Sequence, residues 1–350
     1  MKIWFLADTH LGMKGDNEII LNDCMGYYND VLIPYMKKHV EKDDILVHLG
    51  DVFDNRSSIG IHTMYSAIKL FEELTNIFND IRICVGNHDI WQKNSNEITV
   101  LHAFKYMKNI KVYFNPEIET ICGKSVLFVP WIEDTNKQKE LLNKNDVDYV
   151  FGHLEINGCV TNNRKGIRMN SDNLVKSDNF KKAQVYAGHI HIRQDYKNIH
   201  YVGIPYHKDR GDVGCTNGIT ILDIETGKTK FVENTYSPKY IIENIYDILD
   251  LTVSDLKERW NNNYVDLIVK SSDYSSCNFD KLRDGLCNCF KELNLKSDNS
   301  EGIVGEDVNV DIGESKSSGE MLDDYIDACD IENDMKKRIK GIFKELKNKI

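Results

Sequence analysis

Residues 81–89 read Ile-Arg-Ile-Cys-Val-Gly-Asn-His-Asp. The first five are mostly apolar and β-branched, a pattern typical of a buried strand. Gly86 ends this run and is followed at once by an amide, an imidazole and a carboxylate. Open α/β sheets bind their ligands at the carboxyl ends of strands. The stretch therefore predicts either a ligand-binding edge of a sheet or an ordinary Asn/Asp turn.

The same arrangement recurs elsewhere along the chain. Further strands that end in polar residues are predicted at residues 1–7, 44–50, 146–151 and 183–187. Together the five strand ends offer these candidate ligands: Asp8, His10, Asp51, Asn87, His88, His153, His189 and His191. One such turn can arise by chance, whereas five of them at strand ends indicate a shared site.

Carboxylate, amide and imidazole groups are ligands suited to Mn²⁺, Fe²⁺ or Zn²⁺. No cysteine joins the set, which argues against a closed structural zinc site. The ligands are too many for one ion with open positions. We therefore expect two ions about 3.5–4 Å apart, bridged by Asp51, that polarise a phosphoryl group and activate a water. His88 would then be free to protonate the leaving oxygen as a general acid, whereas His48, inside a strand, is expected to be a core residue.

Composition limits the alternatives. The 350 residues can form one large domain or two smaller ones, and 41% hydrophobic with 28% charged residues is ordinary for a globular protein. A net charge of −11 argues against a protein that holds nucleic acid by its own overall field. It leaves open a nuclease whose metal ions or partner supply the positive charge.

The cysteines and the apolar runs bear on the cellular compartment of the protein. Nine scattered cysteines without a C-x-x-C pair predict a reduced chain with buried thiols. Cys287 and Cys289 lack a second pair and are not expected to bind metal. There is no apolar run of about 18–20 residues and no signal peptide ahead of Asp8. We expect a protein of the cytoplasm, or of the host cytoplasm if it is phage-encoded, with no membrane partner.

Five motifs in this order resemble the calcineurin-like metallophosphoesterase superfamily, over residues 1 to about 235. They are Asp8-x-His10, Gly50-Asp51-x-x-Asp54, Gly86-Asn87-His88-Asp89, Gly152-His153 and Gly188-His189-x-His191. The resemblance implies an α/β fold, a four-layer α-β-β-α sandwich. It implies one metal held by Asp8, His10, Asp51 and His191, and another held by Asp51, Asn87, His153 and His189. It also implies His88 as the catalytic histidine and Mn²⁺ as the metal, with Mg²⁺ as an alternative.

Within the superfamily the chain resembles the SbcD-type DNA repair nuclease subunits, including the small subunit of bacteriophage recombination endonucleases. Phe53 and Asn55-Arg56 replace the Val and Arg-Gly of phosphoprotein phosphatases, and residues 152–155 and 203–205 resemble the nuclease turns Gly-His-x-Glu and Gly-x-Pro. This resemblance implies 3′→5′ exonuclease action on duplex ends, endonuclease action on single strands, and an SMC-like ATPase partner. Cellular members often carry a catalytic His where Asp54 stands. Asp54 can instead orient a ligand histidine.

The chain is predicted to divide into four parts. Residues 1–238 form the nuclease domain and residues 239–296 a small α/β capping domain with helices at 253–260 and 279–293 around a strand at 264–270. Residues 297–318 form an acidic linker. Residues 319–350 form amphipathic helices that either fold back on the cap or bind the ATPase.

Two interaction surfaces remain open on sequence alone. The family implies a homodimer through helices predicted at 62–77 and 97–107, although their apolar stripes are equally well explained as core. The basic loops at 162–165 and 207–210 either contact DNA phosphates or are solvated tips.

Two other functions fit parts of the pattern. A phosphomonoesterase or cyclic-nucleotide phosphodiesterase would share the fold but usually lacks the linker and terminal helices. A scaffold derived from the same fold would have lost ligands, whereas every expected position is filled here.

Overall fold

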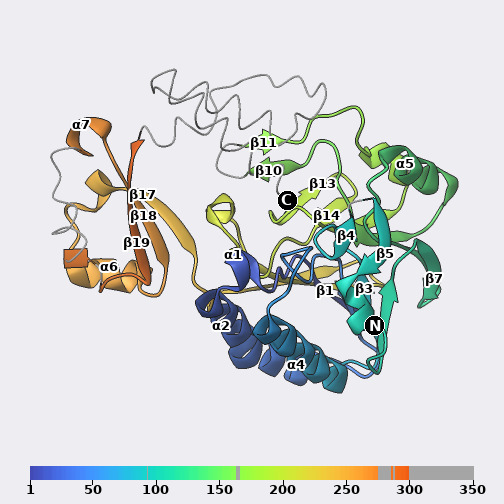
Figure 1. Cartoon of the computed structure of the whole chain (residues 1–350). Helices are drawn as coiled ribbons and strands as arrows, with labels where there is room; N and C mark the ends of the chain where they lie inside the picture. The colour runs from blue at the N-terminus through green and yellow to red at the C-terminus, as the bar shows by residue number, and fades with distance from the viewer. Residues whose placement is uncertain (93, 163–165, 275–284, 287, 299–350) are drawn as a thin grey trace, which may run out of the picture. The chain divides into compact units, whose positions relative to one another are not determined.

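The computed structural model describes residues 1–92, 94–162, 166–274, 285–286 and 288–298 (Figure 1). Met1–Ser297 form one compact unit. The linker and the ATPase-binding helices predicted for residues 297–350 lie outside the described residues, apart from Ser297 and Asp298. Among the described residues, none of the helices combines the length and the apolar composition that crossing a bilayer requires.

The first sheet gathers the N-terminal strands and has the order β16-β15-β1-β2-β3-β6. Strands β1, β2, β3 and β6 are parallel, and β15 and β16 extend the sheet in antiparallel pairs beside β1. The strands are β1 (Lys2–Leu6), β2 (Ile45–His48), β3 (Ile81–Cys84), β6 (Ile110–Tyr113), β15 (Gly218–Asp223) and β16 (Thr229–Glu233).

The second sheet has the order β13-β14-β12-β9-β8-β7. Its four middle strands are parallel, and β13 and β7 are antiparallel edges. The strands are β7 (Glu117–Ile121), β8 (Lys124–Val129), β9 (Tyr149–His153), β12 (Gln184–Gly188), β13 (Gln194–Tyr196) and β14 (Ile199–Tyr201). Strands β7 and β13 were not predicted from the sequence.

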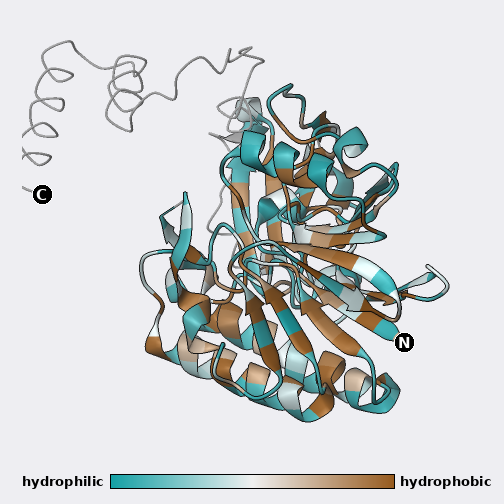
Figure 2. Ribbon diagram, turned by 90° about the vertical axis from the view of Figure 1, so that its right-hand side faces the viewer, coloured by the Kyte–Doolittle hydropathy of each residue, from teal (hydrophilic) through white to brown (hydrophobic). Residues whose placement is uncertain are grey.

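The two sheets pack face to face. Because successive side chains of a strand point to opposite faces, each strand contributes both to the core between the sheets and to a core on its outer face. From β1, Phe5 enters the core between the sheets, where its ring stacks on Tyr186 of β12 at 4.8 Å between centroids. Trp4 points the other way, into the core beneath the helices. Leu127 and Val150 of the second sheet likewise enter a third core on its outer face. Three cores separate four layers, which confirms the predicted α-β-β-α sandwich, and hydrophobic segments run along its strands (Figure 2).

Helices cover the outer faces of both sheets. Those on the first sheet are α2 (Glu18–Tyr27), a π-helical turn (Tyr28–Leu32), α3 (Ile33–His39) and α4 (Ile61–Ile77), with a short irregular α1 (Met13–Asp16) before them. Helix α5 (Thr135–Lys144) packs on the second sheet through Leu142. Pro34 lies in the first turn of α3, where the N–H that proline lacks would have no partner within that helix.

The helix predicted for residues 97–107 was wrong. Residues 97–99 end β5 (Ser95–Thr99), which forms a β-hairpin with β4 (Ile90–Gln92), and one 3₁₀ turn follows (Val100–Ala103). Ile98, Thr99 and Val100 are β-branched and disfavour a helix. The Thr99 hydroxyl also donates to the Asp89 carbonyl at 2.7 Å and accepts from the Leu101 amide at 3.2 Å.

A three-stranded parallel sheet follows, with β17 (Tyr240–Asn244), β18 (Tyr264–Val269) and β19 (Glu292–Ser297). It carries a 3₁₀ turn (Ile245–Ile248), α6 (Val253–Trp260) and α7 (Ser271–Tyr274) around its own core. Helix α6 and strand β18 confirm the predictions.

The predicted helix at 279–293 fails at its end, because Glu292 and Leu293 open β19. Residues 292–297 alternate polar and apolar side chains, the period of a strand, and Leu293 and Leu295 pack on the core. Residues 279–284 lie outside the described part of the chain.

Candidate metal centre

Five strands from the two sheets bring their carboxyl ends together. The segments after β1 and β2 are joined by main-chain hydrogen bonds, from the Asp8 amide to the Gly50 carbonyl at 3.0 Å and from the His10 amide to the Asp51 carbonyl at 3.1 Å. The turn after β3 and the ends of β9 and β12 complete the site. Sequence-distant donors are thus placed by neighbouring strands.

Three overlapping groups of ligand atoms form there, each with its atoms within 4.8 Å of one another. They are Asp8 with His10 and His191; His10 with Asp51 and His88; and Asp51 with His153 and His189. The Asn87 carbonyl oxygen lies 2.8 Å from His153 Nε2 and 2.9 Å from His189 Nδ1. All eight candidate ligands predicted from the sequence therefore lie in one place.

On one side of the centre, His153 is fixed by the sheet itself. Its Nδ1–H donates to the Leu49 carbonyl at 2.9 Å, which leaves Nε2 facing Asp51 Oδ2 at 3.3 Å and the Asn87 oxygen. Burial opposes a charged ring, but the Asp51 carboxylate outweighs it and raises the pKa of His153 to about 9. Electron-pair donors that converge in this way require a proton or a metal ion between them, so the residues fit a cation.

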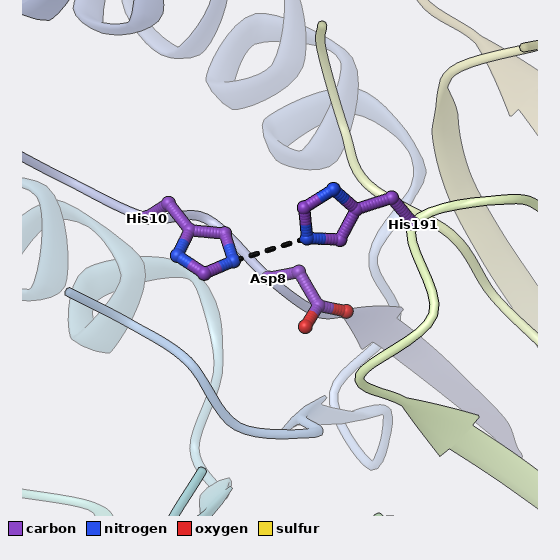
Figure 3. Close-up of side chains that lie close together, drawn as sticks. All are labelled: Asp8, His10 and His191. Atoms are coloured by element: carbon purple, nitrogen blue, oxygen red, sulfur yellow. Dashed lines mark hydrogen bonds between the residues drawn. The ribbon is translucent and has the colours of Figure 1, made fainter. Parts of the chain in front are cut away.

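On the other side, His10 and His191 face each other with their Nε2 atoms 3.2 Å apart, beside Asp8 (Figure 3). Each ring presents its other nitrogen to a carboxylate: His10 Nδ1 lies 3.2 Å from Asp54 Oδ1, and His191 Nδ1 lies 3.3 Å from Asp212 Oδ1. Burial lowers the pKa of His10 to about 3, which favours the neutral ring that a metal needs.

The backbone of the site is strained and tightly packed. Asp8, His10, Asp51 and His189 have φ values of 52°, 42°, 54° and 92°, a region that residues other than glycine rarely adopt. Gly50 has φ 103°, and a Cβ there would lie 2.5 Å from His153 Nδ1. Such clustering of strained residues is typical of functional sites.

The two predicted catalytic residues lie beside these ligands. The His88 amide donates to Asp51 Oδ1 at 2.7 Å, and His88 Nδ1 lies 2.6 Å from the Asp54 carbonyl oxygen. The Asp54 carboxylate faces His10 and, at 2.7 Å, the Lys208 ammonium. Burial acts to raise the pKa of Asp54, but these two partners lower it well below its ordinary value.

Two other polar residues near the centre have structural partners. His48 lies, as expected, in the core, where Nδ1 accepts from the Gly50 amide at 3.3 Å and Nε2 lies 3.1 Å from the Thr9 hydroxyl. Asp89 accepts from the Phe53 and Gly86 amides at 3.1 and 2.9 Å. Burial raises the pKa of Asp89 to about 7.

Sequence reasoning missed the residues that surround the ligands. Asp212 and Lys208 were not assigned to the site, and neither was Trp131, whose ring lies 5.0 Å from that of His189. The basic loop at 207–210 is not a solvated tip, because Lys208 pairs with Asp54 and Arg210 pairs with Asp266. Of the other basic loop, residues 163–165 are outside the described structure.

The model of the calcineurin-like phosphoesterase family matches residues 1–193, more than half of the chain, and the chain belongs to this family. Exonuclease subunit 1 of Enterobacteria phage T4 is 29% identical over 343 residues, which cover 94% of this chain and 93% of that protein.

Two solved structures show weaker likeness. A protein of unknown function from Aquifex aeolicus is 21% identical, with a TM-score of 0.29, over 47% of this chain and 82% of its own. An archaeal phosphodiesterase is 15% identical, with a TM-score of 0.35, over 67% of this chain and 100% of its own. Scores this low do not bear on the fold.

Proposed function

We propose that the chain is the metal-dependent nuclease subunit of an ATPase–nuclease complex that processes DNA ends for recombination and repair. The observation that carries the proposal is the similarity, over nearly the whole chain, to a phage exonuclease subunit. The proposed activities are 3′→5′ exonuclease action on duplex ends and endonuclease action on single strands, in the cytoplasm of the cell or phage host.

The proposed ligands follow the two sides of the centre. Asp8, His10, Asp51 and His191 would hold one ion, and Asp51, Asn87, His153 and His189 the other. We propose Mn²⁺, with Mg²⁺ as an alternative. Bound divalent ions would polarise the phosphoryl group and activate water toward it.

The protein groups around the ions have separate roles in the proposal. With Nδ1–H held by the Asp54 carbonyl, His88 keeps Nε2 for a proton that it delivers to the leaving 3′-oxygen. Its ring lies 4.9 Å from that of His10, next to the centre. Asp54 Oδ1 lies 3.2 Å from His10 Nδ1, and its charge would favour a proton on that nitrogen and leave Nε2 of the ring available to a metal.

We also propose a capping domain at residues 239–296, an acidic linker at 297–318, an ATPase-binding segment at 319–350, and a homodimer. The dimer face would include α4, where Ile61 is 91% and Tyr65 59% exposed. Apolar side chains this exposed are typical of an interface. The ATPase would supply the DNA affinity that a chain of net charge −11 lacks.

The test is cleavage of end-labelled duplex and single-stranded DNA with Mn²⁺, Mg²⁺ or EDTA. Wild type would be compared with His88→Ala and with His39→Ala, which removes an exposed histidine away from the centre. We expect Mn²⁺-dependent cutting that His88→Ala loses, with metal content unchanged, and His39→Ala retains. Cleavage of a small diester but not of DNA, with the ATPase present, would contradict the proposal and favour a small-molecule phosphodiesterase.

A further inference from the structure

The residues between β14 and β15 include a short loop, 207–212. Main-chain amides near its start bind the carboxylate of Asp212 at its end. Asp212 Oδ2 accepts from the amides of Lys208 and Asp209 at 2.7 and 3.0 Å. The Asp212 side chain is 4% exposed. The carboxylate therefore fixes the shape of the 207–212 loop from inside.

Among the described residues, the hydrogen bonds and ion pairs of the loop reach only one side of the metal centre. Asp212 Oδ1 lies 3.3 Å from His191 Nδ1, so the ring donates there and directs Nε2 to the ligand cluster. Lys208 Nζ lies 2.7 Å from Asp54 Oδ1 and 3.3 Å from His10 Nδ1. The loop thus orients His191 directly and reaches His10 through Lys208 and Asp54, whereas His153 is held by the main-chain carbonyl that follows β2.

The other end of the loop is bound to the three-stranded sheet. Arg210 makes a two-pronged ion pair with Asp266 of β18, with Nη2 2.8 Å from Oδ1 and Nε on the other oxygen. Asp266 is 1% exposed, and the Arg210 guanidinium lies 5.2 Å from the centroid of the Tyr240 ring. His207 Nδ1 accepts from the Tyr240 amide at 3.0 Å. Two-pronged pairs of this kind fix geometry as well as charge.

We infer that the 207–212 loop couples the three-stranded sheet to the His10 and His191 side of the centre and sets the metal affinity of that side. Arg210 and Asp266 are then positioning residues that touch no ligand. The inference rests on the proposed metal centre and deepens it. It makes metal loading on one side responsive to whatever binds or shifts the three-stranded sheet.

The test is Mn²⁺ titration of the full chain by calorimetry, with Arg210→Gln as the disrupting variant and Arg210→Lys as a partial rescue. Asp266 keeps Lys296 at 2.7 Å in both, so no buried carboxylate is left unpaired. The matched control is Asp23→Asn. Asp23 also joins this sheet to α2, by Lys291 and by the Tyr264 hydroxyl at 2.9 Å, but no hydrogen bond or ion pair of the described residues joins it to the loop. His191→Ala identifies which binding event belongs to the affected side.

We expect Arg210→Gln to weaken that one event about 10-fold, within the range for residues that orient metal ligands. Arg210→Lys should recover part of the loss, and Asp23→Asn should match wild type. Thermal melts would check that all variants fold. If Arg210→Gln bound Mn²⁺ with both affinities of wild type, the inference would be overturned and the proposed function would stand. Equal weakening in Arg210→Gln and Asp23→Asn would have the same meaning. A wild-type chain that binds no Mn²⁺ would overturn the proposed function together with the inference.

Discussion

The two sides of the metal centre are held in different ways. His153 is fully buried, and its orientation comes from a main-chain carbonyl of the sheet, that of Leu49. His10 and His191 are oriented by the carboxylates of Asp54 and Asp212, which belong to loops. A sheet carbonyl cannot move without disturbing the core between the sheets, whereas a side-chain carboxylate can. The orientation of His153 is therefore fixed by the fold, whereas the orientations of His10 and His191 can change when a loop side chain moves.

The largest effect should come from the residue that both sides share. Asp51 contacts His153 at 3.3 Å and His10 at 3.8 Å. Asp51→Asn removes the negative charge that would attract both metal ions. We therefore expect loss of both metals and a loss of cleavage on the order of a thousandfold or more. Metal content of the purified protein measures this. Asp195→Asn, an exposed carboxylate paired with His200, is the control, and retention of one full equivalent in Asp51→Asn would contradict the bridging role.

The next change should separate the two sides. In Asp212→Asn the remaining oxygen would satisfy the amides of Lys208 and Asp209, and the new NH₂ would face His191 Nδ1. That ring would then carry its proton on Nε2, where the metal needs an electron pair. We expect about 10- to 100-fold weaker Mn²⁺ binding on that side only. Asp209→Asn, whose side chain accepts from the Gly211 amide, should bind as wild type does. Equal weakening on both sides would show that the sides are not independent.

The pH dependence should also differ between the sides. The pKa of His153 is raised from 6.5 to about 9, so metal binding must expel a proton below pH 9. Affinity on that side should rise with pH by about tenfold per unit between 6.5 and 9 and then level off. The ion pair of His153 with Asp51 also stabilises the folded, metal-free protein. This contribution to the free energy of unfolding is complete below pH 6.5 and is lost as the pH rises through 9. Titrations of His191→Ala over this range measure the slope, and a flat profile would contradict the raised pKa.

The smallest change should follow loss of Asp54. Asp54 Oδ1, which faces His10, is buried, but the side chain as a whole is 21% exposed, so water can enter the space that its removal leaves. We expect Asp54→Ala to lower turnover severalfold while the protein still binds both metals. Steady-state cleavage together with metal content tests this, and Asp54→Asn separates charge from hydrogen bonding. Unchanged turnover would remove Asp54 from the mechanism.

The sequence predicted the candidate ligands on both sides of the centre. The donors follow apolar runs directly, and a glycine precedes Asp51, Asn87, His153 and His189, so local pattern alone located them. The outer layer escaped prediction because its contacts cross long stretches of chain: Asp212 lies 21 residues after His191 in a loop without periodicity. The same reason explains why Lys208 and Arg210 read only as basic residues of unknown use.

Two elements were misread for a different reason. At residues 97–107 a few apolar residues fit helical spacing. The structure has a hairpin strand and a 3₁₀ turn there instead, because β-branched residues disfavour a helix and the Thr99 hydroxyl binds the main chain. At residues 292–297 the strand period was present but was absorbed into the end of a predicted helix. Pattern is therefore most reliable in the long core strands and least reliable in short peripheral elements.

The left-handed backbone at Asp8, His10, Asp51 and His189 has a consequence for evolution. Each such residue costs about 1–3 kcal/mol, which glycine at the same position would relieve. In a lineage that no longer used these donors, glycine at His10 or His189 would relieve this strain, whereas glycine at Asp8 or Asp51 would also leave the amides of His189 and His88 without their carboxylate partners. Glycine in place of His10 and His189, in a relative that melts at a higher temperature, would mark a protein that has lost catalytic activity.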